Sequence, residues 1–193
     1  MACSLTSASY AQIGGPADAA DDADDAVTLQ LRWMPQFQFA GYYAALWQGY
    51  YREQGLNVTI EPGAPGKHPH QQVLNGHAQY GVGNSEVLLS YLQGSPLVAL
   101  AAIAQHSPSV LLTRKDSSIR TPQDLIGKRI MMLGGANDIE FLALLANEGI
   151  KTQDLTILPS SYRVDDLIEG KVDAFNAYLS NEPFYLRQQG VEP

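Results

Sequence analysis

The sequence predicts an α/β protein built from two lobes, each with a parallel sheet. Short apolar stretches with strand periodicity alternate with amphipathic helical stretches from residue 27 onward, and such alternation is typical of parallel sheets covered by helices. The alternation runs twice, and the two runs meet near residues 105–108. We therefore expect residues 27–106 to form lobe I and residues 107–193 to form lobe II. Ligands of open α/β sheets bind beyond the carboxyl ends of the strands, so a crevice between the lobes is the expected site.

Lobe I is expected to begin with a strand over residues 27–32, where apolar and polar residues alternate. A helix should follow, because six apolar side chains recur at helical spacing: Phe39, Tyr42, Tyr43, Leu46, Trp47 and Tyr50. Gly55 is its expected stop. Further strands are expected at 57–61 and 79–83, and helices at 71–74 and 85–92. Residues 96–104 are apolar throughout, which favours a buried fourth strand.

Lobe II repeats this order. Strands are expected at 109–115, 127–133, 155–159 and 172–178. Thr121 and Asp124 flank a proline at the spacing of a capping box, which indicates a helix start. A helix from Asn137 to about Asn147, capped by Asn137 and Glu140, is expected after the second of these strands. A helical turn over 164–170 and a final helix from Pro183 complete the pattern.

The composition excludes several classes of function. The formal net charge of -8 argues against nucleic-acid binding, which depends on clustered lysine and arginine. The four histidines lack the spacing of a metal site, and neither a phosphate-binding glycine loop nor a nucleophile elbow is present. We therefore expect a protein that is not an enzyme and that holds no metal and no cofactor.

Residues 1–26 are expected to form a disordered leader, because residues 13–26 consist of Gly, Pro, Ala, Asp and a single Ile. Small residues at Ser9 and Ala11 fit a signal-peptidase site before Gln12. Cys3 leaves a second interpretation open, a lipid-anchored cysteine, and a plain small-residue tail is a third. Export to the periplasm, with or without a membrane anchor, is the expectation that follows.

Aromatic, amide and acidic residues gather where the expected elements begin and end. The candidate ligand-binding residues are Trp33, Phe37, Gln38, Phe39, Tyr42, Asn84, Ser85, Glu86, Gln105, His106, Ser107, Gly135, Asn137, Asp138, Glu140, Tyr178, Asn181 and Glu182. Aromatic faces combined with a few amides and carboxylates suit a small, flat, polar heterocycle.

Structural interpretations stand beside these functional ones. Trp33 could belong to the core, Asn84 could act only as a helix cap, and Glu140 could be a capping-box acid. Asn181 and Glu182 could cap the final helix. The expected helix start after Gly134-Gly135 also predicts free backbone N–H groups facing the crevice, where a ligand would place an acceptor or an anionic group.

Three long stretches carry a resemblance to a known family. Residues 31–63, which begin `LRWMPQFQFAGYY`, resemble the opening of thiamine-pyrimidine precursor-binding proteins and of the related pyrimidine synthases. Residues 80–119 and 170–191 are similar to a subgroup found both as free transporter components and as extracytoplasmic sensors of membrane signalling proteins. The resemblance implies a type II periplasmic-binding-protein fold that closes on a small molecule. It also implies that Trp33 is a stacking platform and that residues 83–86, 105–107, 134–140 and 176–182 contact the ligand.

The sequence departs from this family in two ways. The synthases carry a cysteine-rich iron motif, with a lysine and a histidine for cofactor chemistry, whereas this sequence has one cysteine, Cys3. Family members are also longer, and their chain returns from the second lobe to complete the first, so we expect lobe I to be incomplete here and the chain to self-associate. The predicted function is extracytoplasmic capture of a small planar heterocycle, with a membrane permease or a fused cytoplasmic signalling domain as partner. A pyrimidine-synthase-like enzyme and an interaction module without a ligand are the alternatives.

Overall fold

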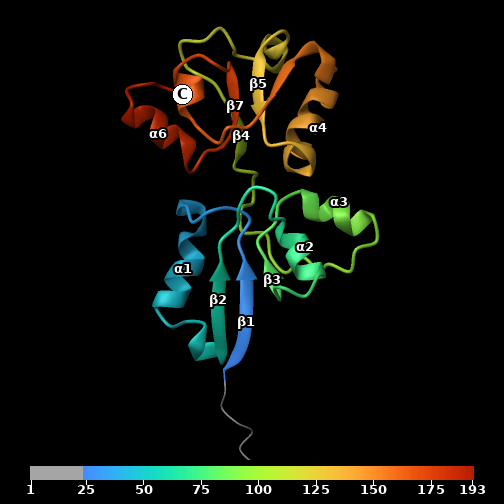
Figure 1. The fold of residues 1–193 in the computed structure, drawn as a ribbon, viewed down its shortest axis with the longest axis vertical. Helices are drawn as coiled ribbons and strands as arrows, with labels where there is room; N and C mark the ends of the chain where they lie inside the picture. Colours follow the sequence, from blue (N-terminus) through green and yellow to red (C-terminus); the bar gives the residue numbers. More distant parts are fainter. Residues whose placement is uncertain (1–23) are drawn as a thin grey trace, which may run out of the picture.

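The computed structural model describes residues 24–193, except for the side chain of Ala136. The predicted leader, including Cys3, therefore falls mostly outside the described residues. The chain forms two α/β lobes (Figure 1), one around each of two sheets, and we keep the names lobe I and lobe II for them. Within the described range, no helix has the length and apolar character needed to cross a membrane.

Lobe I contains a parallel sheet with the strand order β2-β1-β3. Its elements are β1 (Asp25–Gln30), α1 (Ala40–Trp47), β2 (Leu56–Glu61), α2 (Pro69–Leu74), β3 (Tyr80–Gly81) and α3 (Glu86–Leu92). The buried amide of Gln30 donates hydrogen bonds to the carbonyl oxygens of Leu31, Glu61 and Pro62, at 2.9, 3.1 and 3.0 Å. These bonds fix the carboxyl ends of β1 and β2 to each other.

Lobe II contains a mixed sheet with the order β4-β7-β5-β6. Its strands are β4 (Ser109–Leu112), β5 (Arg129–Met132), β6 (Thr156–Pro159) and β7 (Ala174–Tyr178). β5 is parallel to β6 and β7, whereas β4 is antiparallel to β7. The predicted all-parallel arrangement of this lobe is therefore wrong at β4.

The core of lobe II lies on both faces of its sheet, because successive side chains of a strand point to opposite sides. Ile130 and Met132 pack with α4 (Ile139–Asn147), whereas Met131 packs with α5 (Asp165–Ile168) and α6 (Glu182–Gln188). Figure 1 shows α4 and α6 on opposite sides of the sheet. This three-layer packing gives β5 and β7 fixed ends from which site residues project.

Two expectations for lobe I are wrong. Residues 96–104 form no strand, and Val98, Leu100 and Ile103 are exposed. A strand needs a hydrogen-bonded neighbour, and no described strand lies beside this segment. The helix predicted along the apolar stripe from Phe39 to Tyr50 is shorter than expected, because Phe39 belongs to a preceding 3-10 turn and Tyr50 follows the end of α1. Phe39 is the one buried residue of this stripe, and Trp47 and Tyr50 are exposed.

Two helix starts in lobe II differ from the prediction. The Thr121–Asp124 capping box forms, but it opens a short 3-10 helix over Pro122–Leu125. Gly135–Asp138 is also a 3-10 turn, and α4 begins after it with Asp138, not Asn137, at the N-cap. Glu140 is not a capping acid, since its carboxylate accepts a hydrogen bond from the Ser107 hydroxyl at 2.7 Å.

Candidate functional site

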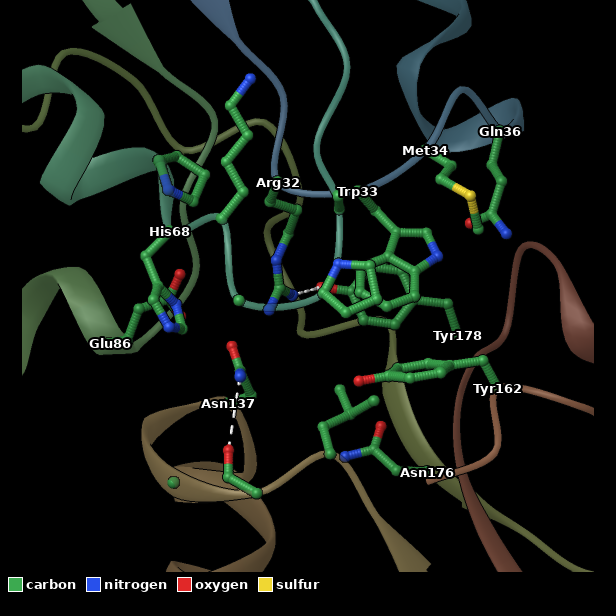
Figure 2. A pocket seen from close by; sticks show the side chains of 18 of the residues that line it. Arg32, Trp33, Met34, Gln36, His68, Glu86, Asn137, Tyr162, Asn176 and Tyr178 are labelled. Carbon is green, nitrogen blue, oxygen red and sulfur yellow. Dashed lines mark hydrogen bonds between the residues drawn. The ribbon is translucent and has the colours of Figure 1, made fainter. Parts of the chain in front are cut away.

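A cleft of about 430 Å³ lies between the two lobes. Figure 2 shows its walls, with lobe I above and lobe II below. Lobe I contributes Arg32, Trp33, Met34, Gln36, Gln38, residues 64–71 and Glu86. Lobe II contributes Leu133, Gly134, Gly135, Asn137, Tyr162, Phe175, Asn176, Ala177, Tyr178 and Glu182. Most of these residues follow the carboxyl ends of β1, β2, β5 and β6, which is where parallel sheets bind ligands.

Two aromatic rings from opposite lobes meet in the cleft. The ring centroids of Trp33 in lobe I and Tyr162 in lobe II are 5.3 Å apart, with their planes inclined by 42°. Both side chains remain partly exposed. This arrangement offers two apolar faces to a flat molecule at the mouth between the lobes.

Gly63, in the loop after β2, sets the position of Trp33. Its backbone N–H donates a hydrogen bond to the carbonyl oxygen of Trp33 at 2.9 Å. A Cβ atom on Gly63 would lie 2.4 Å from the carbonyl carbon of Arg32 and 2.4 Å from the backbone nitrogen of Trp33. Only glycine permits this close approach of two backbones.

Replacing Gly63 with alanine should therefore displace the Trp33 backbone, weaken ligand binding and lower the free energy of unfolding by about 1–3 kcal/mol. Calorimetric titration and denaturant unfolding measure the two effects. Gly41→Ala is the matched control, because a Cβ atom there meets nothing within 4 Å. Unchanged affinity in the Gly63 variant would show that the placement of Trp33 does not matter for binding.

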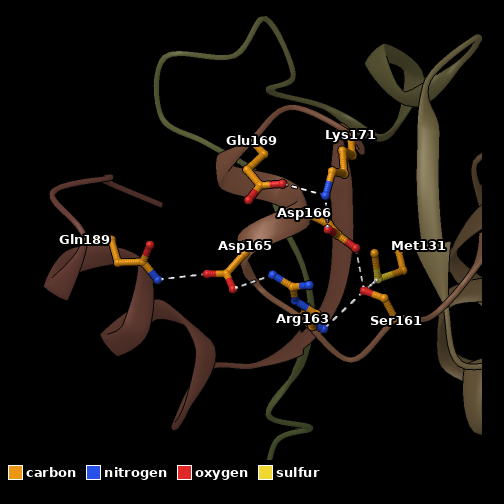
Figure 3. Close-up of polar contacts among 8 residues, drawn as sticks. All are labelled: Met131, Ser161, Arg163, Asp165, Asp166, Glu169, Lys171 and Gln189. Atoms are coloured by element: carbon orange, nitrogen blue, oxygen red, sulfur yellow. Dashed lines mark hydrogen bonds and ion pairs between the residues drawn. The ribbon is translucent and has the colours of Figure 1, made fainter.

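Tyr162 has an unusual backbone conformation, with a φ of 59°. Bulky residues rarely adopt the left-handed region, and such residues collect at functional sites. The Ser160 hydroxyl accepts the Tyr162 N–H at 3.1 Å, and the Ser161 hydroxyl donates to the Asp166 carboxylate at 2.6 Å. Figure 3 shows that further polar contacts, through Arg163, Asp165 and Lys171, join this loop to α5 and its neighbours. The tyrosine is thus presented to the cleft by an anchored loop.

Arg32 and Tyr178 form a polar contact between the lobes. The Arg32 guanidinium donates a hydrogen bond to the Tyr178 hydroxyl and lies 5.5 Å from the centroid of its ring. The Asn84 amide also approaches this hydroxyl, at 3.5 Å. Burial raises the pKa of Tyr178, although Arg32 acts in the opposite direction. The hydroxyl therefore stays protonated at neutral pH.

Asp138 organises the lobe II wall without lining the cleft. Its carboxylate is 2 % exposed. It accepts hydrogen bonds from the backbone N–H groups of Leu133 and Gly134 and, at 2.9 Å, from the Asn176 amide. The Leu133 and Gly134 N–H groups are therefore not free for a ligand. The N–H groups at the helix start, over residues 135–138, are different groups, and their contact with a ligand stays a prediction. Gly135 and Asn137 still face the cleft.

The cleft brings together part of the predicted set. Trp33, Gln38, Glu86, Gly135, Asn137, Tyr178 and Glu182 all line it. Glu182 also accepts the backbone N–H of Tyr178 at 2.7 Å, which joins the end of β7 to the start of α6.

Lobe I residues of the predicted set that do not line the cleft face solvent, lie in the core or hold neighbouring residues in place. Phe37 is 77 % exposed and Phe39 is buried in the core. Tyr42 is partly buried beside Tyr51. Burial is the main cause that raises the pKa of Tyr42, and the nearby Tyr51 hydroxyl raises it further. Ser85 is the N-cap of α3. The backbone N–H of Asn84 donates a hydrogen bond to the Glu86 carboxylate, with 3.0 Å between the nitrogen and Oε1.

Several predicted residues near the lobe crossing and in lobe II also lie outside the cleft. Gln105 donates to the Ala102 carbonyl oxygen, and His106 is exposed. Ser107 pairs with Glu140. Asn181 is buried and donates to the Glu182 carboxylate at 2.8 Å. None of these residues, nor Asp138, lines the cleft, because their side chains are engaged with other parts of the protein or face solvent.

Sequence reasoning missed several lining residues. The loop over residues 64–71 was given no ligand-binding role, yet it follows β2 as Trp33 follows β1, and that parallel placement was a usable signal. Arg32 lies next to Trp33, which was a candidate, and Asn176 falls within residues 176–182, for which the resemblance implied ligand contact. Tyr162 had no signal, since its role depends on a backbone conformation that the sequence does not reveal. Residues 24–193 contain no group of three or more His, Cys, Asp or Glu side chains arranged to hold a metal ion.

Comparison with known proteins places the chain in a family. Residues 36–193 match the family model described as NMT1/THI5 like. Riboflavin-binding protein RibY of Chloroflexus aurantiacus is 29 % identical over 99 % of this chain and 57 % of its own length. The 4-amino-5-hydroxymethyl-2-methylpyrimidine phosphate synthase THI13 of Saccharomyces cerevisiae is 29 % identical over 78 % and 45 %, respectively. The formylaminopyrimidine-binding protein of Halalkalibacterium halodurans is 21 % identical over 88 % and 53 %.

Solved structures agree on the fold. A protein from Bordetella bronchiseptica superposes with a TM-score of 0.69 at 21 % identity, covering 88 % of this chain and 55 % of that one. The periplasmic aliphatic sulphonate binding protein SsuA of Escherichia coli gives a TM-score of 0.64 at 20 % identity, with 87 % and 59 % covered. These matches confirm the type II periplasmic-binding-protein fold. The chain spans about half the length of the curated relatives it matches. Since the family model covers well over half of the chain, this protein belongs to the NMT1/THI5-like family.

Proposed function

We propose that this chain is an extracytoplasmic solute-binding domain that captures a small planar nitrogen heterocycle between its lobes. The aromatic pair formed by Trp33 and Tyr162 carries the proposal, because the two rings line the cleft from opposite lobes and a flat ligand can stack on one of them or, once they separate, between them. Two relatives, a riboflavin-binding protein and a formylaminopyrimidine-binding protein, support a ligand of this shape. The cleft volume of about 430 Å³ suits a molecule of that size.

The location and partners follow from the same proposal. The fold is that of periplasmic binding proteins, which supports a position outside the cytoplasm. Two roles fit a binding domain of this kind. It delivers its ligand to a separate membrane permease, or it senses the ligand for a fused cytoplasmic signalling domain. The parent gene and its neighbours distinguish them, since a permease gene favours transport and a membrane segment followed by an output domain favours sensing.

A screen of ligands by thermal unfolding tests the proposal. The panel contains riboflavin, aminopyrimidines, thiamine, an aliphatic sulfonate and an aromatic acid. A ligand present at about one hundred times its dissociation constant should add about 2.7 kcal/mol to the free energy of unfolding. We expect a planar heterocycle to stabilise the protein and the sulfonate to leave it unchanged. Stabilisation by the sulfonate alone would refute the assignment.

An enzymatic role is the second candidate, because several relatives are named as pyrimidine phosphate synthases. The iron motif that the resemblance attributes to those enzymes needs several cysteines, and the only cysteine of this sequence is Cys3. Lys67 lines the cleft, but its ammonium group contacts the Glu61 carboxylate at 3.8 Å and the Pro62 carbonyl oxygen at 3.4 Å. Within this chain, the cleft therefore offers a lysine and two histidines, Lys67, His68 and His70, but no cysteine. Incubation with pyridoxal phosphate and iron, followed by a search for a pyrimidine product, separates the two roles.

Self-association is a further expectation for the 193-residue chain. Large apolar side chains of lobe I are exposed on α3 and on the following segment, including Leu88, Leu92, Val98, Leu100 and Ile103. Contiguous apolar surface of this kind recruits other chains. We expect light scattering to show oligomers of this chain. A monodisperse monomer at the same protein concentrations would contradict this expectation.

A further inference from the structure

Lobe I leaves many of its apolar side chains exposed. Among the described residues, both clusters of buried apolar side chains lie in lobe II. The large apolar side chains exposed on α3 and on the segment after it are Leu88, Leu89, Tyr91, Leu92, Val98, Leu100 and Ile103. Figure 1 shows α3 on the side of lobe I opposite α1. Exposed apolar side chains that gather in this way mark a surface that contacts another molecule.

The backbone after α3 also lacks partners. From Val98 to Ile103, no backbone N–H group donates a hydrogen bond within the described part of the chain. Only the Ala102 carbonyl oxygen accepts one there, from the Gln105 amide at 2.7 Å. All six residues are exposed. We call residues 97–103 the open segment, because it presents both free backbone groups and apolar side chains, as an unpaired strand edge does.

The open segment carries none of the features that usually protect a strand edge. Such edges are commonly blocked by charged side chains or by proline. No Asp, Glu, Lys or Arg occurs from Val87 to Thr113, and the open segment contains no proline. Val98 and Ile103 are β-branched, which favours a strand. Nothing in the segment therefore opposes pairing with a further strand.

The distribution of charge favours a second copy of this chain as the partner. Residues 27–106 contain three basic and three acidic residues, so lobe I has no formal net charge. The net charge of -8 comes from five aspartates in residues 1–26 and from lobe II, which has nine basic and twelve acidic residues. Two copies that meet through lobe I keep their like-charged parts apart, whereas contact through lobe II would bring them together.

We propose that two copies of this chain associate by antiparallel pairing of their open segments across a twofold axis at Leu100. A twofold axis brings the same surface of each copy together. With Leu100 facing its equivalent, Leu97 of one copy lies opposite Ile103 of the other, so the cross-strand pairs are apolar. This inference rests on the self-association expected above and gives it a specific interface, and it is independent of the ligand in the cleft.

A lipid surface is the other apolar partner that such residues suggest. Backbone N–H and C=O groups that enter hydrocarbon without partners are costly in free energy. The open segment has a row of these groups, and the strand of a second copy supplies hydrogen bonds that lipid does not. The structure therefore favours a protein strand as the partner.

Sedimentation velocity on the 193-residue chain without ligand tests the interface. We expect a dimer, and Leu100→Lys should raise its dissociation constant at least about tenfold, because two ammonium groups would face each other across the axis. Trp47→Lys is the matched control. Trp47 is an exposed apolar residue on α1, on the other side of lobe I, so this variant should dimerise as wild type does.

Disulfide formation tests the register and keeps the test open if Leu100→Lys does not fold. Opposite residues of antiparallel strands have Cβ atoms about 4.5–5.5 Å apart, close to the spacing that a disulfide needs. In a Cys3→Ser background, oxidised glutathione should therefore join Leu100→Cys chains into a covalent dimer, visible on denaturing electrophoresis. Trp47→Cys chains in the same background should stay unlinked.

The outcomes separate this inference from the proposals above. A monomer at all protein concentrations would overturn both this inference and the expected self-association, and the ligand screen would still decide on ligand capture. A dimer that Leu100→Lys leaves unchanged and that Leu100→Cys does not link would overturn this inference alone, since another surface then joins the copies. A chain that stays monomeric in solution and sediments with phosphatidylcholine vesicles would assign the open segment to a lipid surface.

Discussion

Replacing Trp33 with alanine is expected to weaken ligand binding at least about tenfold, or ~1.4 kcal/mol, while the fold survives. The indole is only half-buried and meets Tyr162 across the cleft, so its removal takes away one face of the stacking site. Because Trp33 is not part of either hydrophobic core cluster, we expect the unfolding temperature to change little. Calorimetric titration with a ligand from the thermal screen measures the loss of affinity.

Trp47 supplies the matched control. It is the only other tryptophan, it is 79 % exposed, and it lies outside the cleft. Trp47→Ala should therefore leave the dissociation constant unchanged. If the Trp33→Ala protein folds and binds with wild-type affinity, Trp33 does not stack on the ligand. Loss of the fold would instead favour the interpretation of Trp33 as a core residue.

Replacing Asp138 with alanine should lower the free energy of unfolding by about 3 kcal/mol, the largest stability effect we expect in the cleft region. The substitution leaves the Leu133 and Gly134 N–H groups and the Asn176 amide without their acceptor. Gly134 and Asn176 line the cleft, so ligand affinity should fall as well. Denaturant unfolding measures the first effect and calorimetry the second.

Two further variants check this explanation. Asp138→Asn keeps one acceptor oxygen and should be destabilised less than the alanine variant. Asp116→Ala removes an exposed carboxylate that pairs with Arg114, and such surface pairs contribute little to stability. Equal losses in the Asp138→Ala and Asp116→Ala proteins would show that the buried carboxylate does not organise this wall.

Much of the fold could be predicted because local patterns determine it. The alternation of strands and helices, the α/β class and the positions of β5 and β7 follow from hydrophobic periodicity, which burial enforces. The strand predicted at residues 96–104 is wrong for the same physical reason. An apolar sequence indicates that a segment needs cover, but a strand also needs a hydrogen-bonded neighbour, and local sequence does not identify that neighbour.

The candidate site was predictable where a residue directly follows a strand, as Trp33 does, or belongs to a motif such as that containing Glu86. It was not predictable where tertiary packing decides which way a side chain faces. Phe39 and Asp138 have suitable chemistry and lie near the cleft, yet both are buried behind its wall. Tyr162 reaches the cleft through a left-handed backbone conformation, which sequence periodicity cannot indicate.

Tryptophan fluorescence of a Trp47→Phe protein tests most directly whether a planar ligand stacks on Trp33. Since the sequence has two tryptophans, all indole emission from this variant comes from Trp33. Titration with the planar heterocycle that stabilises the protein most should change this emission saturably, with one ligand bound per chain, and Tyr162→Ala should shift the curve to weaker affinity. Unchanged Trp33 emission, while calorimetry on the same sample records binding, would place the ligand elsewhere and contradict the account.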